Sequence, residues 1–435
     1  MEKQKIFGKI YSPEHSEDVI ENVWLHIHSD KIYIEAPQEF YGDKNWQILL
    51  GEFNGLDKVT FVNSHTGGGS SGSGGSWRRI YVSYMLKGVH LNSYQELVFK
   101  KVSLTSPALS NWITLPEGIE ETDRNLYKVP EIRTILKTQV DDFLISIKIG
   151  HSREVSFKKL NVQKKCFISI ESPNPIHVQD LSEVFRKIKK WILFITNKNP
   201  EFSEYYLTDT KDEVYELVNT LDDLNESRFT QNLSLSFYNL KTSIEPLFHE
   251  WMTNDKLHTI IDIIQEKEYN TDMSFQSYFL NMCVAIESFH YIFGDESKNE
   301  KTQIRINDRE LILSLIQDQQ LKERFEGVSQ RWHESTYRER LKSYKNIFEQ
   351  IMGDSFKFSA SKLINKIVNT RNSLAHSGTY KDNMKHIELL LIGKVIEFTI
   401  KQEILKLLKY EPKREGQIIE DSKRHIEILA SLNEY

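Results

Sequence analysis

Residues 275–293, FQSYFLNMCVAIESFHYIF, decide the fold of the C-terminal part of the chain. The large apolar side chains in this stretch recur at spacings of four and three residues, which places them on one face of a single helix: Phe275, Phe279, Met282, Ile286, Phe289 and Phe293. An aromatic stripe of this kind can line a cofactor, but it more often packs between helices. We therefore expect residues 275–293 to form a helix whose apolar face lies in a core.

The chain after this stretch keeps the helical period. Further helices are expected over about 330–350, 360–376 and 383–409, with short connections between them. Four or five helices joined in this way form a compact bundle. The sequence thus predicts an all-helical domain over residues 269–435.

The first part of the chain has a different pattern. Before residue 170, short runs rich in Ile, Val, Tyr and Phe are bounded by Asn, Asp, Gly and Pro, which are strand signals; examples are KIFGKIY (5–11), VWLHIHSDKIYIEA (23–36) and CFISIES (166–172). Helical patterns follow near 180–197 and 240–267. We place all these segments in one N-terminal β-rich domain, residues 1–268, and the fold class is therefore α+β.

The composition is that of a globular protein, with 39% hydrophobic and 27% charged residues in a chain of 435. Because the formal net charge is -6, any nucleic-acid surface must be a local basic patch. The two cysteines, Cys166 and Cys283, have no metal-ligand spacing, which favours a reducing compartment without structural zinc. The sequence has no apolar signal region and no apolar run of membrane-spanning length, so we expect a cytoplasmic protein without membrane contact.

A Gly/Ser tract, residues 66–76, joins two strand-like runs. Gly67, Gly69 and Gly72 formally match GxGxxG, but no helix signal follows them, and Ser76 stands where a P-loop needs lysine. We interpret the tract as a flexible loop and not as a phosphate-binding site.

The stretch that carries chemistry is residues 359–380, SASKLINKIVNTRNSLAHSGTY, which contains the pattern R-N-x-x-x-H at Arg371, Asn372 and His376. The pattern alone has little weight, because a chain with 14 histidines holds about one Arg and His at this spacing by chance. On a helix, Asn372 and His376 continue a polar stripe that begins at Asn365 and Asn369. Arg371 is turned about 100° from Asn372 and roughly 140° from His376. Two copies about a twofold axis could bring these groups into one cleft.

The residue types suit metal-independent cleavage of RNA. That reaction needs a base for the 2′-hydroxyl proton, an acid for the departing 5′-oxygen and cations for the charge at phosphorus. His376 lies just before Ser377 and Gly378, an expected helix end, where the helix dipole favours the protonated imidazole. The alternative is that Arg371 and His376 only cap and salt-bridge a surface helix.

The string TRNSLAHSG near the end of a penultimate bundle helix resembles the signature of HEPN domains. Residues 278–293 resemble the first HEPN helix of ApeA-like anti-phage proteins, and residues 58–65 and 81–113 are similar to the N-terminal domain of that family. The Gly/Ser tract lies where that domain has a variable loop.

The resemblance implies an N-terminal sensor of a phage component and a HEPN endoribonuclease that needs no metal or other cofactor. Its substrate would be host or shared RNA, with transfer RNA as one candidate. The family motif implies that Arg371, Asn372 and His376 are catalytic. Glu287 is a candidate for orienting Arg371, and a carboxylate that only pairs two helices is the equal alternative.

Basic residues mixed with aromatic ones near the motif suggest where RNA could bind. Lys366 and Lys362 lie about one and two turns before Arg371, while Arg338 and Arg340 belong to the basic helix expected over 330–350. The alternative for that helix is a solvated face balanced by neighbouring acids.

Three function classes remain to be compared. The first is a homodimeric or larger ribonuclease that the β-rich domain restrains until a phage-derived trigger binds. The second is a non-catalytic interaction or RNA-binding protein that uses the helical bundle as its binding module. A metal nuclease is the weakest, because the sequence has neither HExxH nor a cysteine cluster.

Overall fold

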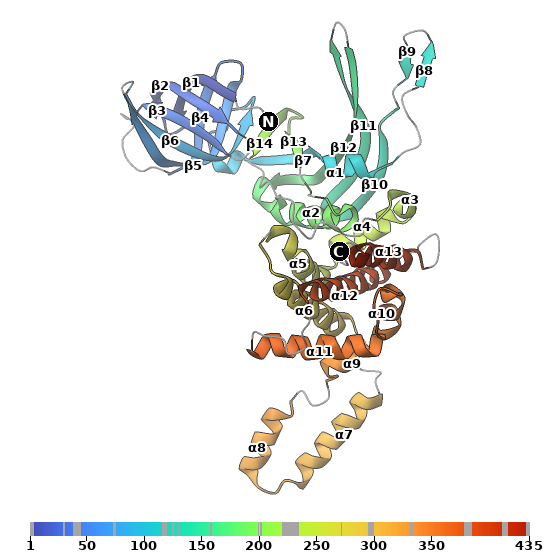
Figure 1. Ribbon diagram of the computed structural model, residues 1–435. Coiled ribbons are helices and arrows are strands. Elements are labelled where there is room, and N and C mark those ends of the chain that lie inside the picture. The colour runs from blue at the N-terminus through green and yellow to red at the C-terminus, as the bar shows by residue number, and fades with distance from the viewer. Residues whose placement is uncertain are drawn as a thin grey trace. The chain divides into compact units, whose positions relative to one another are not determined.

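The computed structural model describes residues 4–28, 31–37, 45–72, 75–114, 120–123, 126–128, 130–156, 159–198, 200, 202–219, 235–270, 272–294, 300–330, 334–377, 385–410 and 416–431. The chain divides into two compact units (Figure 1). The N-terminal unit comprises residues 1–225 and 234–253, and the helical unit comprises residues 226–233 and 254–435. A functional boundary near residue 268 stays a prediction.

The N-terminal unit begins with a closed six-stranded antiparallel barrel. Its strands are β1 (Gln4–Ser12), β2 (His15–Ile27), β3 (Ile32–Pro37), β4 (Asn45–Phe53), β5 (Asp57–Gly72) and β6 (Gly75–Lys87). They pair in the order β6-β3-β2-β1-β4-β5, and β5 pairs with β6 to close the ring. Alternate residues point inward, so that Leu25, Ile34, Phe61 and Ile80 are fully buried in one core. The predicted β-rich N-terminal region is confirmed.

The sheet continues from β6 into six more strands. These are β7 (Val98–Thr105), β10 (Arg133–Val140), β11 (Phe143–Ser156), β12 (Lys159–His177), β13 (Ser203–Thr208) and β14 (Val214–Asn219). β14 pairs with β6, and the order from there is β13-β7-β12-β11-β10. Helices α1 (Pro107–Trp112), α2 (Ser182–Thr196), α3 (Phe237–Leu240) and α4 (Ile244–Thr253) accompany these strands, and β8 (Glu120–Asp123) and β9 (Leu126–Lys128) form a small separate hairpin. The helix predicted near 180–197 is confirmed as α2.

The prediction of a flexible loop over the Gly/Ser tract is wrong for most of its length. β5 and β6 stay paired through Ser70↔Trp77 to Gly72↔Gly75. A ladder uses backbone groups alone, so residues without large side chains can extend it. Glycine is also needed at one point, because a Cβ atom on Gly69 would lie 2.7 Å from the carbonyl oxygen of Trp77.

The helical unit is built around α6 (Phe275–Phe293), which packs against α5 (Asp255–Tyr269) and α12 (His386–Leu407). Its other helices are α7 (Glu300–Leu315), α8 (Gln319–Val328), α9 (Tyr337–Ser343), α10 (Lys345–Met352), α11 (Ala360–Ser377) and α13 (Gln417–Ser431). The predicted core stripe of α6 is confirmed, because Phe279, Met282 and Ile286 are at most 1% exposed. Tyr278 of the same helix packs so closely on Gly393 that a Cβ atom there would lie 2.5 Å from the ring.

Two predicted helices are each divided in the structure. The stretch 240–267 breaks at Asn254, whose side chain accepts a hydrogen bond from the Leu257 backbone and thereby caps α5. The stretch 330–350 becomes α9 and α10, because Thr336 and Glu339 form a capping box that begins α9 and the helical path is interrupted at Tyr344. Residues 331–333 lie outside the described part of the chain.

α11 and α12 agree closely with their predicted ranges, 360–376 and 383–409. α7 and α8, by contrast, were not predicted. Of the helices that the structure describes, none has both the length and the apolar character needed to cross a membrane.

Candidate active site

α11 carries the R-N-x-x-x-H motif and is fixed by its apolar side. Leu363 and Ile367 are fully buried, and Thr370 and Leu374 are less than 9% exposed. The polar stripe of Asn365, Asn369, Asn372 and His376 is exposed along the other side of the helix. Packing of the buried face therefore determines which motif residues meet other helices and which meet solvent.

Arg371 is held in place by three groups. Its Nη2 donates a hydrogen bond to Oε2 of Glu287 on α6 at 3.3 Å. Its Nη1 donates to Oδ1 of Asn372 at 3.3 Å, and its Cζ lies 5.4 Å from the ring centre of Tyr337 on α9. About a third of the Arg371 side chain (34%) is exposed. The guanidinium is thus oriented by its neighbours while part of it remains open to a ligand.

Glu287 joins α6 to α9 as well as to α11. One of its oxygens lies 3.9 Å from Nη1 of Arg340, and Nη2 of Arg340 lies 3.4 Å from a carboxylate oxygen of Glu334. The Arg340 side chain is only 7% exposed, and its Cζ lies 5.8 Å from the ring centre of Tyr291. Two arginines and two glutamates thus alternate, in the order Arg371, Glu287, Arg340 and Glu334, and their charges offset one another. An anionic ligand would therefore have to bind at the exposed part of Arg371.

Cys283 and Tyr337 are buried next to each other and close to the guanidinium of Arg371. Burial raises the pKa of the Cys283 thiol to about 12, although the Tyr337 hydroxyl and the Arg371 charge lower it. Burial, together with the neighbouring Cys283, also raises the pKa of Tyr337 well above its usual range. Both groups therefore stay protonated at neutral pH, which suits a packing role and not that of a nucleophile or base.

His376 lies in the last turn of α11 and is exposed. Within the described ranges it forms no hydrogen bond or ion pair with another side chain. Five residues separate it from Arg371, which on a helix means about 7.5 Å along the axis and roughly 140° around it. A single copy of α11 therefore does not bring the histidine and the arginine onto one face.

The four residues predicted to bind RNA have different surroundings. Lys362 is exposed on α11, and Nζ of Lys366 pairs with Glu388 at 2.8 Å. Arg338 donates a hydrogen bond to Oδ1 of Asn365. Arg340 is buried in the ion-pair cluster with Glu287, and this packing does not favour its predicted contact with RNA. For all four residues RNA binding stays a prediction.

Of the contacts that orient Arg371, only the one with Glu287 was suggested beforehand, through the family resemblance, with helix pairing as the equal alternative. The sequence predicted neither the contact of Tyr337 with Arg371 nor the pairing of Arg340 with Glu287. Cys283 and Glu287 are spaced by four residues on α6, and Tyr337 and Arg340 by three on α9, so each pair lies on one helix face. That spacing was the available signal, but it does not reveal that the two faces meet.

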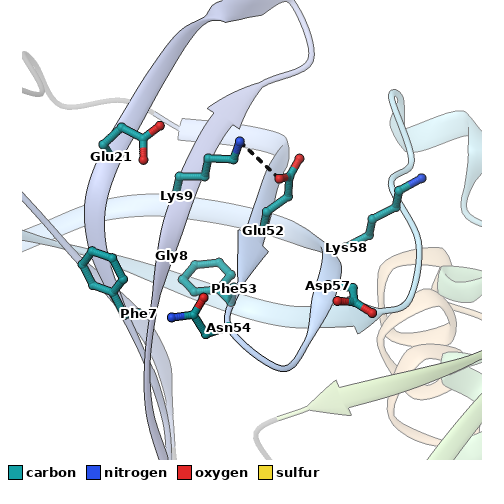
Figure 2. Close-up of a pocket in the computed structure, with 9 residues that line it drawn as sticks. All are labelled: Phe7, Gly8, Lys9, Glu21, Glu52, Phe53, Asn54, Asp57 and Lys58. Carbon is teal, nitrogen blue, oxygen red and sulfur yellow. Dashed lines mark ion pairs between the residues drawn. The ribbon is translucent and has the colours of Figure 1, made fainter.

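A separate cavity of about 580 Å³ lies on the barrel of the N-terminal unit (Figure 2). Phe7 and Phe53 line it together with charged groups of both signs, and Nζ of Lys9 pairs with Glu52 at 3.2 Å. Gly8 is required there, because a Cβ atom would lie 2.6 Å from the Phe53 ring. Among the described residues, no group of three or more His, Cys, Asp and Glu side chains could hold a metal ion.

Comparison with known families agrees with both halves of this description. A family model described as ApeA N-terminal domain 1 matches residues 5–262, and a model described as Apea-like HEPN matches residues 280–412. Neither the curated proteins nor the solved structures include a match to the chain.

Proposed function

The chain belongs to the ApeA family and contains a HEPN domain, and from this we propose that it is a metal-independent endoribonuclease of anti-phage defence. HEPN domains are typically ribonucleases. The proposal rests on the surroundings of Arg371. Glu287 and Tyr337 orient its guanidinium, while a third of its side chain stays exposed. A preorganised cation at the surface is suited to stabilise the charge that develops on a phosphate during cleavage.

The proposed reaction uses the RNA itself as the nucleophile. His376 accepts the proton of a 2′-hydroxyl, the 2′-oxygen attacks phosphorus, and the bond from phosphorus to the 5′-oxygen breaks. A second imidazole, in its protonated form, gives its proton to the leaving 5′-oxygen. The products carry a 2′,3′-cyclic phosphate and a 5′-hydroxyl. Arg371 stabilises the charge on the phosphoryl oxygens, and Asn372 supports the orientation of Arg371.

The need for two imidazoles supports a homodimer as the active unit. One copy of the chain supplies one motif, and on α11 its histidine and arginine point in different directions. A twofold axis beside α11 would place His376 and Arg371 of both copies around one cleft. In this arrangement each copy supplies half of the site.

Glu287 and Tyr337 are proposed as positioning residues. They contact Arg371 and not the RNA, and their effect on the reaction passes through the guanidinium. Since the fork of an arginine matches two phosphoryl oxygens, lysine at position 371 would not replace it.

The N-terminal unit is proposed as the sensor of a phage component. Its barrel cavity of about 580 Å³ has the size of small-ligand and peptide-anchor sites, which makes it a candidate for receiving part of the trigger. Binding of the trigger would favour the active state of the nuclease, a population shift set by its higher affinity for that state. The substrate is proposed to be cellular RNA, with transfer RNA as a candidate.

The experiment is a comparison of RNA ends. Cells expressing the wild-type chain, Arg371→Ala or His376→Ala are infected, and new 5′-hydroxyl ends are mapped by sequencing. We expect new ends with the wild type and with Asn369→Ala, a control on the exposed stripe of α11, and none with the two motif variants. A His376→Ala chain that protects cells as well as the wild type would support the non-catalytic alternative.

A further inference from the structure

The helical pair α7–α8 leaves large aliphatic side chains in solvent. Five of them are more than half exposed: Ile304 52%, Leu311 59%, Leu315 70%, Leu321 56% and Val328 84%. α8 has no buried residue at all, and Figure 1 shows α7 and α8 as a hairpin that projects from the other helices of its unit. Single exposed aliphatic residues are common on protein surfaces, but a group of this size on one element marks an interaction surface.

These side chains form one continuous stripe along each helix. Ile304, Leu311 and Leu315 are spaced by seven and four residues, which keeps them within about 40° around α7. Leu321 and Val328 are spaced by seven on α8. The side of α7 that contacts α9 lies away from the stripe, because Arg305, about 100° around the helix from Ile304, pairs with Glu339 at 2.8 Å. Beyond it, Arg309 donates to the Ser329 carbonyl at the end of α8 at 3.0 Å. The stripe therefore faces away from the other helices of the unit because of the side on which α7 is anchored, and not because its side chains are loosely packed.

A second hairpin of the same kind fits this surface. Two helices cannot enclose an outward stripe, whereas two hairpins together make a four-helix bundle with the stripes inside. Among the described side chains, an acid lies beside the stripe of α7 and a base beside that of α8: Asp308 is about 40° around the helix from Ile304, and Arg324 is about 60° from Leu321. In a twofold arrangement α7 of one copy meets α8 of the other, so acid meets base at both ends.

We propose that the α7–α8 hairpin is the main contact surface for a second copy of this chain, in the same twofold dimer whose axis is proposed to run beside α11. The surface lies on helices that carry no motif residue, so it can be tested apart from cleavage. It also deepens the proposed function, on which its catalytic consequence rests, because ion pairs and hydrogen bonds connect the hairpin to Arg371 through α9 and α6.

That connection begins at Arg305, whose Nη2 lies 2.8 Å from Glu339 and whose Nη1 donates to the Glu334 carbonyl at 3.0 Å. The Arg305 guanidinium holds the pKa of Glu339 at about 2, so this pair stays charged at neutral pH. The Glu334 carboxylate pairs with Arg340, Arg340 approaches Glu287, and Glu287 binds Arg371. A copy that docks on the hairpin thereby fixes the base of α7, to which the orientation of Arg371 is linked.

The test is sedimentation of the full-length His376→Ala chain, which removes cleavage from the experiment. We expect a dimer at micromolar concentration and a monomer after Leu311→Glu with Leu315→Glu, with a dissociation constant raised at least a hundredfold. Gln303→Glu with Ser314→Glu is the matched control, because it adds the same charge to exposed positions of α7 away from the stripe. This control should remain a dimer.

Circular dichroism and the melting temperature establish that the variants are folded, which we expect because the replaced side chains are more than half exposed. If the α7 variant does not fold, Val328→Glu on α8 tests the same surface. A wild-type monomer at all concentrations would overturn the proposal and leave the hairpin to a different protein. A dimer that persists in the folded stripe variants would overturn it too, since the copies would then meet elsewhere. A wild-type chain that forms this dimer but does not cleave RNA would instead count against the proposed catalytic function and leave the contact surface supported.

Discussion

Oε2 of Glu287 on α6 lies 3.3 Å from Nη2 of Arg371 on α11. The two side chains are 31% and 34% exposed, so their ion pair adds little to stability, about 1 kcal/mol or less. The contact is therefore better explained by the direction it gives the guanidinium than by the energy it contributes to the fold.

Replacing Glu287 with glutamine tests that role. The amide keeps one hydrogen-bond acceptor but loses the charge, so we expect kcat to fall by about one order of magnitude and Glu287→Ala to lower it by about two, with KM little changed. Steady-state cleavage of a defined RNA measures both constants. Equal kcat values for the wild type and Glu287→Ala would assign the carboxylate to helix pairing alone.

Arg305 offers a test of the connection between the hairpin and the site. Arg305→Gln removes the ion pair with Glu339, and we expect the chain to remain dimeric while kcat falls about tenfold. Arg305→Lys should restore part of the loss. The matched control is Arg309→Gln on the same side of α7, since Arg309 contacts Ser329 and not Glu339 or Glu334. Identical kcat values for both glutamine variants would contradict the connection.

A buried charge cluster predicts how stability depends on pH. Lys267 donates to Glu397 at 2.5 Å, Tyr278 donates to the other oxygen of that carboxylate, and Lys401 lies one turn further along α12. Burial lowers the pKa of Lys401 to about 7 from 10.5. Between these values the unfolded chain binds more protons than the folded one, so the free energy of unfolding rises with pH by up to roughly 1.4 kcal/mol per pH unit.

Lys401→Met removes that contribution. We expect the variant to be more stable than the wild type at pH 7 and the difference to shrink as the pH rises towards 10.5, because the free energy needed to remove the proton of the wild-type lysine on folding decreases over that range. Urea unfolding at a series of pH values measures the difference. A variant that is less stable at pH 7 would mean that the charged ammonium contributes favourably to this cluster.

The sequence predicts best what local periodicity determines. The stripe of α6 and the two faces of α11 follow from spacings of three and four residues, and the structure buries most of the expected side chains in both. The break at Asn254 was missed because apolar residues continue on both sides of it, and the capping bond is visible only in the structure. The paired Gly/Ser tract was missed because its ladder uses backbone groups that every residue has.

The candidate site likewise has features that follow from the local sequence and features that depend on how the helices pack. The position of Arg371, Asn372 and His376 on one helix follows from the motif, whereas the partners of Arg371 come from α6 and α9, which are more than 30 residues away in the chain. Glu287 was suggested by resemblance to a family helix. The spacing of Tyr337 and Arg340 places them on one face of α9 but does not distinguish them from surface residues, because their role depends on how three helices pack.

The most direct test of the account is cleavage of purified RNA by the activated full-length chain in the presence of a metal chelator. We predict strand cleavage with 2′,3′-cyclic phosphate ends, at least a hundredfold slower with His376→Ala and with Arg371→Lys, and unchanged with Asn369→Ala. Full activity of the His376→Ala chain, or cleavage by the wild type that stops when metal ions are chelated, would contradict it.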